Sequence, residues 1–356
     1  MGTTTDDTPA PVPAERLQRF IARILQAVDL PPADAASVAE LMTRADLIGA
    51  DGHGVFRLPQ YARRIRNKGI NVRPNIRLVS EKAAMALVDG DNGMGHLVMR
   101  FAAETAMKKA KGAGVAWVGV RASNHAGPAS LYASMPLAQD MIGLYLAVGN
   151  ANHLPPWGGI DMLLSTNPLA VAVPTQDEPP IVLDMATTVA AYGKVKTKAQ
   201  RGETMPEGWM IDRQGKPLTD PKRADEGFLV PIGGYKGYGL ALIIGLLAGT
   251  LNGAAMARET VDFNKDEVTK TNTGQAVVAI DLAAFGPVDD FKRRVDDVAR
   301  QMRGSARLPG VERIWLPGEQ SHGKRQHRSK QGIPLPAPLR RQLDALATEL
   351  KVEPLS

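Results

Sequence analysis

The pattern of apolar and polar positions predicts helices at both ends of the chain. Over residues 14–28 apolar side chains recur at three- and four-residue spacing, which is typical of one buried helix face. A second helix is expected over 32–48, because a proline pair at its start suits a first helical turn. Short helical patterns follow over 58–68 and 338–350. The N-terminal part is therefore expected to be a helical unit.

The middle of the chain alternates short β-branched runs with helical stretches. Strands are expected over 84–88, 115–120, 142–148, 169–173, 181–183 and 275–282, and helices over 97–111, 128–138, 240–251 and 288–302. This alternation predicts an α/β fold. Residues 201–229 are expected to form a long loop and 256–273 an exposed one. The helix over 240–251 has no polar face, so it should be buried in the core or in an interface.

One Gly-x-Gly pair, Gly112 and Gly114, stands between a predicted helix and a predicted strand. A dinucleotide fingerprint requires the opposite order, a strand, then glycines, then a helix, together with a third glycine. The pair is better interpreted as a helix C-cap. Any dinucleotide is therefore expected to be bound by a different architecture.

The loop over 51–59 reads Asp-Gly-His-Gly-Val-Phe-Arg-Leu-Pro and carries two groups suited to chemistry. Arg57 could hold a carboxylate through two parallel hydrogen bonds. His53 could donate, accept or carry a proton near neutral pH. A surface turn with both side chains in water is the alternative interpretation.

A second histidine, His125, follows the strand expected over 115–120, and strand ends are where open α/β sheets place their sites. The helix expected over 128–138 would begin just beyond it. A position at a helix N-terminus disfavours the imidazolium, which would leave His125 free to accept a proton. A histidine that only caps this helix is an equally good interpretation.

Other polar groups lie where they could meet a polar ligand. The strand ends at 165–168 and 184–188 carry Ser, Thr, Asn and Asp side chains that could line a ribose and a pyrophosphate. Lys236 stands among glycines in the segment Gly-Gly-Tyr-Lys-Gly-Tyr-Gly, so its ammonium could meet a phosphate or a carboxylate. This segment does not have the spacing of a Walker loop.

Composition removes several classes of function. The chain has 356 residues and no cysteine, which excludes disulfides, thiolate nucleophiles and cysteine-ligated zinc. The net charge of +6 is small for this length and does not argue for nucleic acid. The basic run over 322–330 is interpreted as a solvated stretch, and its two histidines are five residues apart, which does not suit a helical metal pair. No metal site is predicted.

No apolar run reaches the roughly 20 residues that span a bilayer, and no basic segment followed by an apolar run stands at the start. A cytoplasmic protein is therefore expected, with no membrane or nucleic-acid partner.

Six segments, taken in order and spacing, resemble one known family. They are ADLIGADGHGVFRLPQY (45–61), SNHAG (123–127), STNPLAVAVP (165–174), IVLDMATTVAAYGKV (181–195), GGYKGYGLAL (233–242) and LPGEQ (316–320). The sequence is similar to the malate/L-lactate dehydrogenase-type family of NAD(P)-dependent oxidoreductases, which includes ureidoglycolate, sulfolactate and piperideine-carboxylate enzymes. The matching segments are spread over nearly the whole chain.

The resemblance implies an α/β fold of three α/β/α layers with a mixed sheet and a dinucleotide-binding domain unlike the Rossmann fold. It implies a helical unit over 1–80 that carries the catalytic loop, an α/β region over 81–310 that binds cofactor and substrate, and a segment over 311–356 that packs back on the helical unit. The enzyme is expected to be a homodimer with its active site near the subunit interface. It is expected to oxidise the CH–OH group of a small malate- or lactate-like 2-hydroxy acid with NAD, or with NADP.

The resemblance also assigns roles to residues. His125 matches the proton acceptor, Arg57 a substrate-binding arginine, and His53 the histidine of the N-terminal catalytic loop, which also binds substrate. The positions expected to contact the nicotinamide dinucleotide are Thr166, Asp184, Met185, Ala186, Lys236, Pro317, Gly318 and Glu319.

Two departures from the family pattern matter. Many relatives have Ser-His-Gly where this chain has Gly52-His53-Gly54, so a relay through that serine hydroxyl is absent unless water replaces it. Imine-reducing relatives carry an aspartate where this chain has Lys194, which counts Lys194 among the catalytic candidates and favours a hydroxy acid. The alternatives are an NADPH-dependent imine or 2-oxo acid reductase and a non-catalytic nucleotide-binding relative. A nucleic-acid-binding module at 322–330 is a third and weaker alternative.

Overall fold

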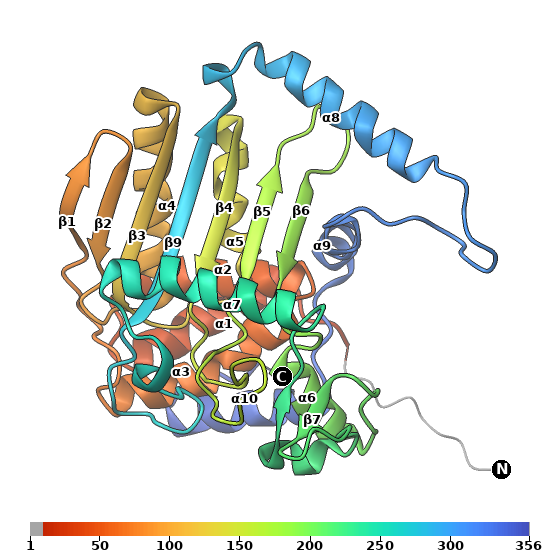
Figure 1. Ribbon diagram of the computed structural model, residues 1–356. Coiled ribbons are helices and arrows are strands. Elements are labelled where there is room, and N and C mark those ends of the chain that lie inside the picture. Colours follow the sequence, from red (N-terminus) through yellow and green to blue (C-terminus); the bar gives the residue numbers. More distant parts are fainter. Residues whose placement is uncertain (1–9, 356) are drawn as a thin grey trace.

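The computed structural model describes residues 10–355, and its centre is a seven-stranded sheet (Figure 1). Its strands, in spatial order, are β1 (Arg77–Lys82), β2 (Met85–Asp89), β3 (Val115–Ser123), β9 (Thr273–Asp281), β4 (Met141–Ala147), β5 (Leu169–Val173) and β6 (Ile181–Met185). Strands β2 and β3 are parallel, and the other neighbours pair antiparallel. The expected mixed sheet is confirmed, and its antiparallel majority differs from the parallel sheet of a Rossmann fold.

Helices lie on both faces of this sheet and complete three layers. Helices α4 (Gly95–Ala113) and α5 (Ser130–Ala133) pack on one face, while α7 (Tyr235–Ala248) crosses the lower part of the other face (Figure 1). Helix α4 is the crossover between the parallel strands β2 and β3. It ends at Gly114, whose φ of +78° suits only glycine and whose N–H donates to the Ala110 carbonyl at 2.7 Å. The predicted helix C-cap is confirmed.

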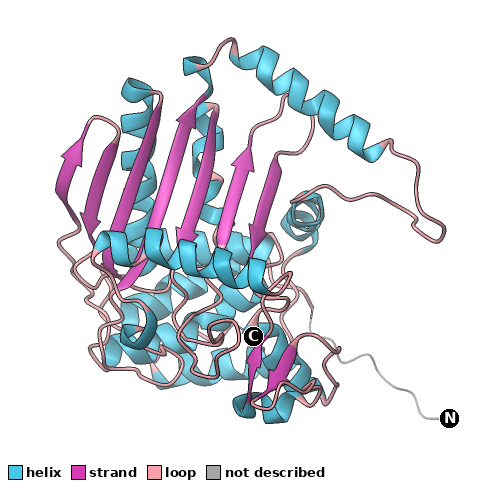
Figure 2. Cartoon of the chain, viewed as in Figure 1, coloured by secondary structure: helices cyan, strands magenta, loops and turns pink. Residues whose placement is uncertain are grey.

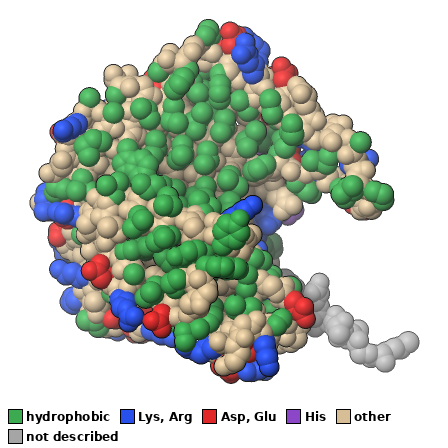
Figure 3. All heavy atoms as spheres, in the orientation of Figure 1, with side chains coloured by type: hydrophobic (Ala, Val, Ile, Leu, Met, Phe, Trp, Pro, Cys, Tyr) green, Lys and Arg blue, Asp and Glu red, His purple; other side chains and the backbone are tan. Residues whose placement is uncertain are grey.

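Strand β4 shows that the two faces of the sheet are covered unequally. Every second residue from Met141 to Ala147 is buried against α4 and α5, whereas Ile142, Leu144 and Leu146 on the opposite face are only partly buried. Because side chains alternate between the faces of a strand, both faces of this sheet are apolar. Figure 3 shows hydrophobic side chains gathered over the partly covered face and over α7.

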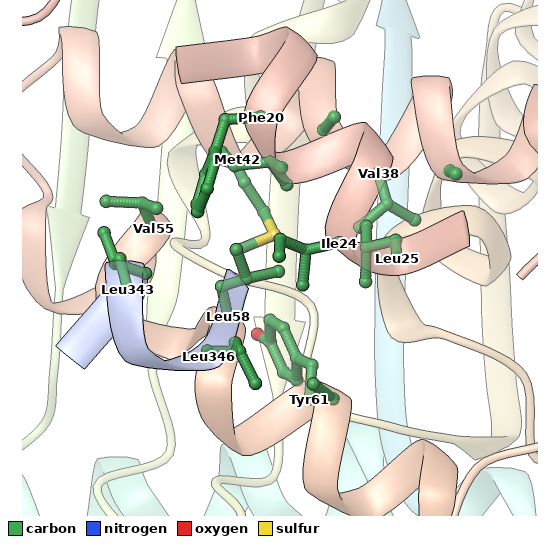
Figure 4. Packing of buried hydrophobic residues seen from close by; sticks show 14 of the residues in the cluster. Phe20, Ile24, Leu25, Val38, Met42, Val55, Leu58, Tyr61, Leu343 and Leu346 are labelled. Atoms are coloured by element: carbon green, nitrogen blue, oxygen red, sulfur yellow. The ribbon is translucent and has the colours of Figure 1, made fainter. Parts of the chain in front are cut away.

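Segments from both ends of the chain form the helical unit. Helices α1 (Ala14–Ala27), α2 (Pro32–Leu47), α3 (Leu58–Arg66) and α10 (Ala337–Glu349) share one hydrophobic core. Figure 4 shows Leu343 and Leu346 of α10 among Val55, Leu58 and Tyr61. Helix α10 thus packs against α1, α2 and α3, while the division of the chain into units at residues 80 and 310 stays a prediction.

The remaining elements lie around the sheet. They are the helices α6 (Tyr192–Arg201), α8 (Val288–Arg303) and α9 (Glu319–Gln331), the strands β7 (Met210–Asp212) and β8 (Gly227–Leu229), and the 3₁₀ turns Asp51–His53, Val55–Arg57, Met135–Gln139, Pro221–Glu226, Thr250–Asn252, Ala257–Glu259 and Leu282–Ala284. Strands β7 and β8 form a small sheet apart from the main one, as Figure 2 shows. Among the described residues, no helix is both long enough and apolar enough to cross a bilayer.

Several local expectations were wrong, each because contacts distant in sequence decided the structure. Strand β1 was missed, since its side chains are mostly exposed and show no clear alternation. The segment 201–229 is no plain loop: it holds β7 and β8 and packs a small core with α6. The segment 256–273 is not simply exposed, because Phe263 is 5% exposed within the helical core. The basic run over 322–330 is mostly exposed, as expected, but it also forms most of α9, a helix that was not predicted.

Candidate active site

Two loops distant in sequence meet at one cavity of about 560 Å³. His53 and Arg57 come from the loop between α2 and α3, and His125 follows β3. Thr166 and Lys194 line the same cavity. The four residues expected to be catalytic therefore share one pocket with one of the residues expected to bind the cofactor.

The loop over 51–57 is held in place from two sides. On the inner side, the buried carboxylate of Asp46 accepts a hydrogen bond from the backbone N–H of Val55 at 2.8 Å. Gly54 allows this approach, because a Cβ there would lie 2.1 Å from an Asp46 oxygen. On the outer side, Arg328 of α9 pairs with Asp51 and donates to the Asp46 carbonyl. Helix α9 therefore buttresses the loop that carries His53 and Arg57.

Most of the N–H groups of the Arg57 guanidinium donate hydrogen bonds to other residues of the protein. Its Nε donates to the Gly52 carbonyl at 2.9 Å, and its Nη1 donates to Gln60 at 3.0 Å and to Asn264 at 3.1 Å. In the described part of the chain, no hydrogen bond engages Nη2. The guanidinium thus has a fixed direction and presents one nitrogen to a ligand, instead of the two-nitrogen fork that the sequence suggested.

The imidazole of His125 lies between two flat rings. The His53 ring stacks on one side with a centroid distance of 5.6 Å, and the Phe263 ring stacks on the other at 4.9 Å. The hydroxyl of Tyr61 lies 2.5 Å from Nδ1 of His125. With the ring proton on Nδ1, the Tyr61 oxygen accepts it and Nε2 is free to take a proton. The Gly127 N–H also lies 3.4 Å from Nδ1, near the upper limit for a hydrogen bond, so the much shorter contact to Tyr61 outweighs it.

The surroundings keep the histidines of the cavity neutral. Loss of hydration, followed by the nearby positive charge of Arg57, lowers the pKa of His125 well below its ordinary value of 6.5. The same two causes lower the pKa of His53 to about 4. Burial raises the pKa of Tyr61, which stays a neutral phenol. An uncharged imidazole can accept a proton at neutral pH.

The helix-dipole explanation for a neutral His125 was wrong. The helix expected over 128–138 divides into the four-residue α5 and a 3₁₀ turn, and α5 begins only at Ser130. A single helical turn five residues away gives no sizeable dipole at the imidazole, because the effect falls off within the first turn. Desolvation and Arg57 account for the neutral ring.

Most residues expected to contact the cofactor lie beside the cavity and not in its wall. Thr166 connects the two regions, because its carbonyl accepts from the Thr187 N–H at 3.0 Å. The Ile232 N–H donates to the Thr187 carbonyl at 3.0 Å, which ties the segment before Lys236 to the end of β6. The Val182 N–H donates to the Pro317 carbonyl at 3.0 Å. Hydrogen bonds thus gather the segments that carry the expected residues around β6.

The side chains of the residues expected to contact the cofactor differ in whether they already have a partner within the protein. Asp184 accepts a hydrogen bond from the Ser130 N–H at 2.9 Å. Glu319 is buried and forms ion pairs with Arg303 and Arg313, so its carboxylate is committed within the protein. Lys236 is exposed in the first turn of α7.

Sequence reasoning did not single out several residues that line or support the cavity. Gln60 and Tyr61, which contact Arg57 and His125 but do not line the cavity, lie at the end of the resembling segment over 45–61 and were given no role. Phe263 and Asn264 come from the segment expected to be an exposed loop. Lys196 is two residues beyond Lys194 on α6, and its only sequence signal was its place in a basic stretch after the resembling segment over 181–195.

Comparison with known proteins agrees with this geometry. The family model for malate/L-lactate dehydrogenase matches residues 12–344. The chain belongs to the malate/L-lactate dehydrogenase family. It is 37% identical to a malate dehydrogenase of Pyrococcus horikoshii over 97% of this chain and 96% of that protein. The solved structure of a malate dehydrogenase from that organism superposes with a TM-score of 0.90 and covers 99% of both chains at 34% identity.

Other relatives within the family carry different substrate names. An L-sulfolactate dehydrogenase of Methanocaldococcus jannaschii is 36% identical over 94% of this chain and 96% of its own length. A ureidoglycolate dehydrogenase (NAD(+)) of Escherichia coli strain K12 is 32% identical over 90% of both chains. The expected family, its α/β fold, and the expected oxidoreductase acting on hydroxy acid and oxo acid pairs are confirmed by these matches.

Proposed function

We propose that this family member is an NAD-dependent 2-hydroxy acid dehydrogenase whose proton acceptor is His125. The observation that carries the proposal is the cavity in which a neutral imidazole lies beside the charged Arg57. Oxidation of a 2-hydroxy acid needs a cation for the carboxylate and a base for the hydroxyl proton, and these two groups supply both. His53, at the same wall, completes the substrate-binding side.

The chain's own residues would divide the reaction as follows. Nη2 of Arg57 holds the substrate carboxylate and fixes the acid within the cavity. Nε2 of His125 takes the hydroxyl proton while the Tyr61 oxygen accepts a hydrogen bond from Nδ1. Lys194 in the cavity wall would stabilise negative charge on the substrate oxygen as its proton leaves. The nicotinamide, when bound, supplies the acceptor for the hydride from C2.

The segments around β6 fit such a cofactor. Helix α7 begins after Gly233 and Gly234, both with positive φ, and no side chain caps its first N–H groups. These N–H groups and the Lys236 ammonium form a donor set suited to a pyrophosphate. The position of Thr166 in the cavity wall would bring the nicotinamide end towards His125. The preference for NAD over NADP is part of the proposal.

The test is a dehydrogenase assay over 2-hydroxy acids with NAD and with NADP. His125→Ala should lower turnover by about 10²- to 10⁴-fold, because general-base help is lost. Cofactor affinity, measured by NADH fluorescence, should stay unchanged. The matched control is His327→Ala, which removes an exposed histidine of α9. Near-normal turnover in His125→Ala would refute the role, and nucleotide binding without turnover in the natural chain would indicate a non-catalytic relative.

We also propose that the protein is a homodimer located in the cytoplasm. The support for a dimer is the apolar sheet face together with α7, whose Ile243 and Leu246 are 53% and 41% exposed. The exposed residues Met302 and Trp315 follow along α8 and the segment after it. Apolar surfaces this extended usually mark an interface. Sedimentation equilibrium tests the dimer, and cell fractionation tests the location.

A further inference from the structure

Helix α6 brings three lysines to the cavity, and they do not have the same partners. Lys194, Lys196 and Lys198 all line it. The Lys198 ammonium is 2.6 Å from a carboxylate oxygen of Glu203, so its charge is already paired. Among the described residues, no carboxylate lies within ion-pair distance of Lys196. Lys196 is therefore a cavity cation whose charge is open to a ligand.

The surroundings hold the Lys196 ammonium near the cavity. It lies 5.5 Å from the centre of the Tyr192 ring, which is within the range of a cation–π contact. The Tyr192 ring in turn stacks on His153 at a centroid distance of 4.1 Å. Both aromatic residues line the cavity as well. The ammonium thus lies against the Tyr192 ring, which is part of the cavity wall.

Lys196 and Arg57 repel each other across this space. Loss of hydration lowers the pKa of Lys196, and the positive charge of Arg57 lowers it further. Asp262 and Asp225 oppose this effect from outside ion-pair distance, and Lys265 adds to it. Two cations that face one pocket are stabilised when negative charge comes between them, and a ligand with a single carboxylate can reach only one of them closely.

We propose that Lys196 is a second anion-binding group of the active site, so that the enzyme selects 2-hydroxy acids that carry a second negative group. Arg57 would hold the carboxylate next to the reacting carbon, and Lys196 the carboxylate or sulfonate at the far end. This inference rests on the proposed dehydrogenase function and narrows its substrate class. Malate-like and sulfolactate-like acids would be favoured over lactate.

The experiment compares matched substrates in matched variants. The natural enzyme should reduce oxaloacetate with a higher kcat/KM than pyruvate, and Lys196→Met should lower this ratio by about ten- to a hundredfold, the usual effect of losing a charge-assisted contact. Pyruvate reduction by Lys196→Met should change little. Lys196→Arg should restore most of the ratio. Lys222→Met, which removes an exposed ammonium that does not line the cavity, should leave the ratio unchanged. Including sulfopyruvate identifies which acidic group Lys196 prefers.

Binding measurements separate failure of this inference from failure of the proposed function. The dissociation constants of L-malate and L-lactate are measured by calorimetry on the full chain without turnover. If Lys196→Met binds malate as tightly as the natural protein, or if its kcat/KM ratio is unchanged, Lys196 is not an anion-binding group. If no 2-oxo acid is turned over but Lys196→Met still loses malate affinity, the dehydrogenase proposal fails and the anion site stands.

Discussion

At the scale of single residues, the chemistry depends on how completely water is kept away from one imidazole. His53 and Phe263 cover the two faces of His125, and Tyr61 meets its Nδ1. A charged imidazolium would lose hydration here and would also face Arg57. The neutral form is therefore favoured far below the usual histidine range, which keeps the base ready in acid solution.

The pH dependence of substrate oxidation should show this shift. The proposed proton acceptor, His125, would work as neutral imidazole, and its pKa in the free protein is lowered well below 6.5. We expect kcat/KM, which reports the free enzyme, to stay level as the pH falls through 6.5 and to decline only at lower pH. A pH profile of kcat/KM with a 2-hydroxy acid measures this. An acid limb centred at 6.5 would contradict the desolvated site.

Arg57→Lys should mainly raise KM. The lysine keeps the charge but cannot reproduce the contacts to Gly52, Gln60 and Asn264 that fix the direction of the guanidinium. We expect KM for the hydroxy acid to rise about tenfold or more, with a smaller change in kcat. Steady-state kinetics gives both constants. An unchanged KM would show that Arg57 does not hold the carboxylate.

At the scale of elements, α9 connects two parts of the site. Its first residue, Glu319, belongs to the segment beside β6, and Arg328 near its other end holds the loop over 51–57. The sequence suggested only a solvated basic stretch here, because charge alone does not reveal a partner. Asp51 and Asp46 supply that partner from α2 and the loop after it.

Arg328→Ala should loosen the loop over 51–57 without removing any group from the cavity wall. The variant loses the ion pair with Asp51 and the hydrogen bond to the Asp46 carbonyl. One hydrogen bond from a charged group contributes about 1.5–3 kcal/mol to stability. We expect a lower melting temperature and a raised KM for the hydroxy acid. Thermal melts and steady-state kinetics measure the two effects.

Lys330→Ala serves as the control, because Lys330 is an exposed cation on the same helix. It should change neither quantity appreciably. Equal behaviour of the two variants would mean that Arg328 contributes only charge to the helix surface and does not buttress the loop.

At the scale of the whole molecule, the sheet is apolar on both faces but only one face is fully covered within the chain. Helices α4 and α5 bury the first face, while α7 covers part of the second (Figures 1 and 3). The expectation that the apolar α7 would be buried in the core or in an interface is met in part. Its inner side is buried, and its outer side is left for the proposed partner subunit.

A charge on this surface should separate the proposed dimer. Ile243→Glu places a carboxylate at a side chain that is 53% exposed, so the monomer should still fold. Burying that charge in an interface costs several kcal/mol, which would dissociate the subunits. Sedimentation equilibrium should give the monomer mass. Val79→Glu, at an exposed valine of β1, is the matched control, and a monomeric natural protein would overturn the dimer.

The sequence by itself determined the elements whose signal is local. The helical faces of α1, α2 and α10, the C-cap at Gly114 and the strands β2 to β6 and β9 follow from periodicity and from glycine's conformational freedom. The motifs around His53, Arg57 and His125 named candidate groups, and the order and spacing of the six resembling segments assigned roles to them.

Only the tertiary structure decided what those groups can do. The lowered pKa of His125 depends on Phe263, from a segment expected to be exposed, and on His53, from a loop 72 residues earlier in the chain. Gln60 and Asn264 occupy Nη1 of Arg57, which leaves Nη2 without a hydrogen-bond partner among the described residues. The charge of Lys196 is unpaired because no carboxylate in the described part of the chain lies within ion-pair distance. Desolvation and pairing arise between segments far apart in sequence, so no local pattern contains them.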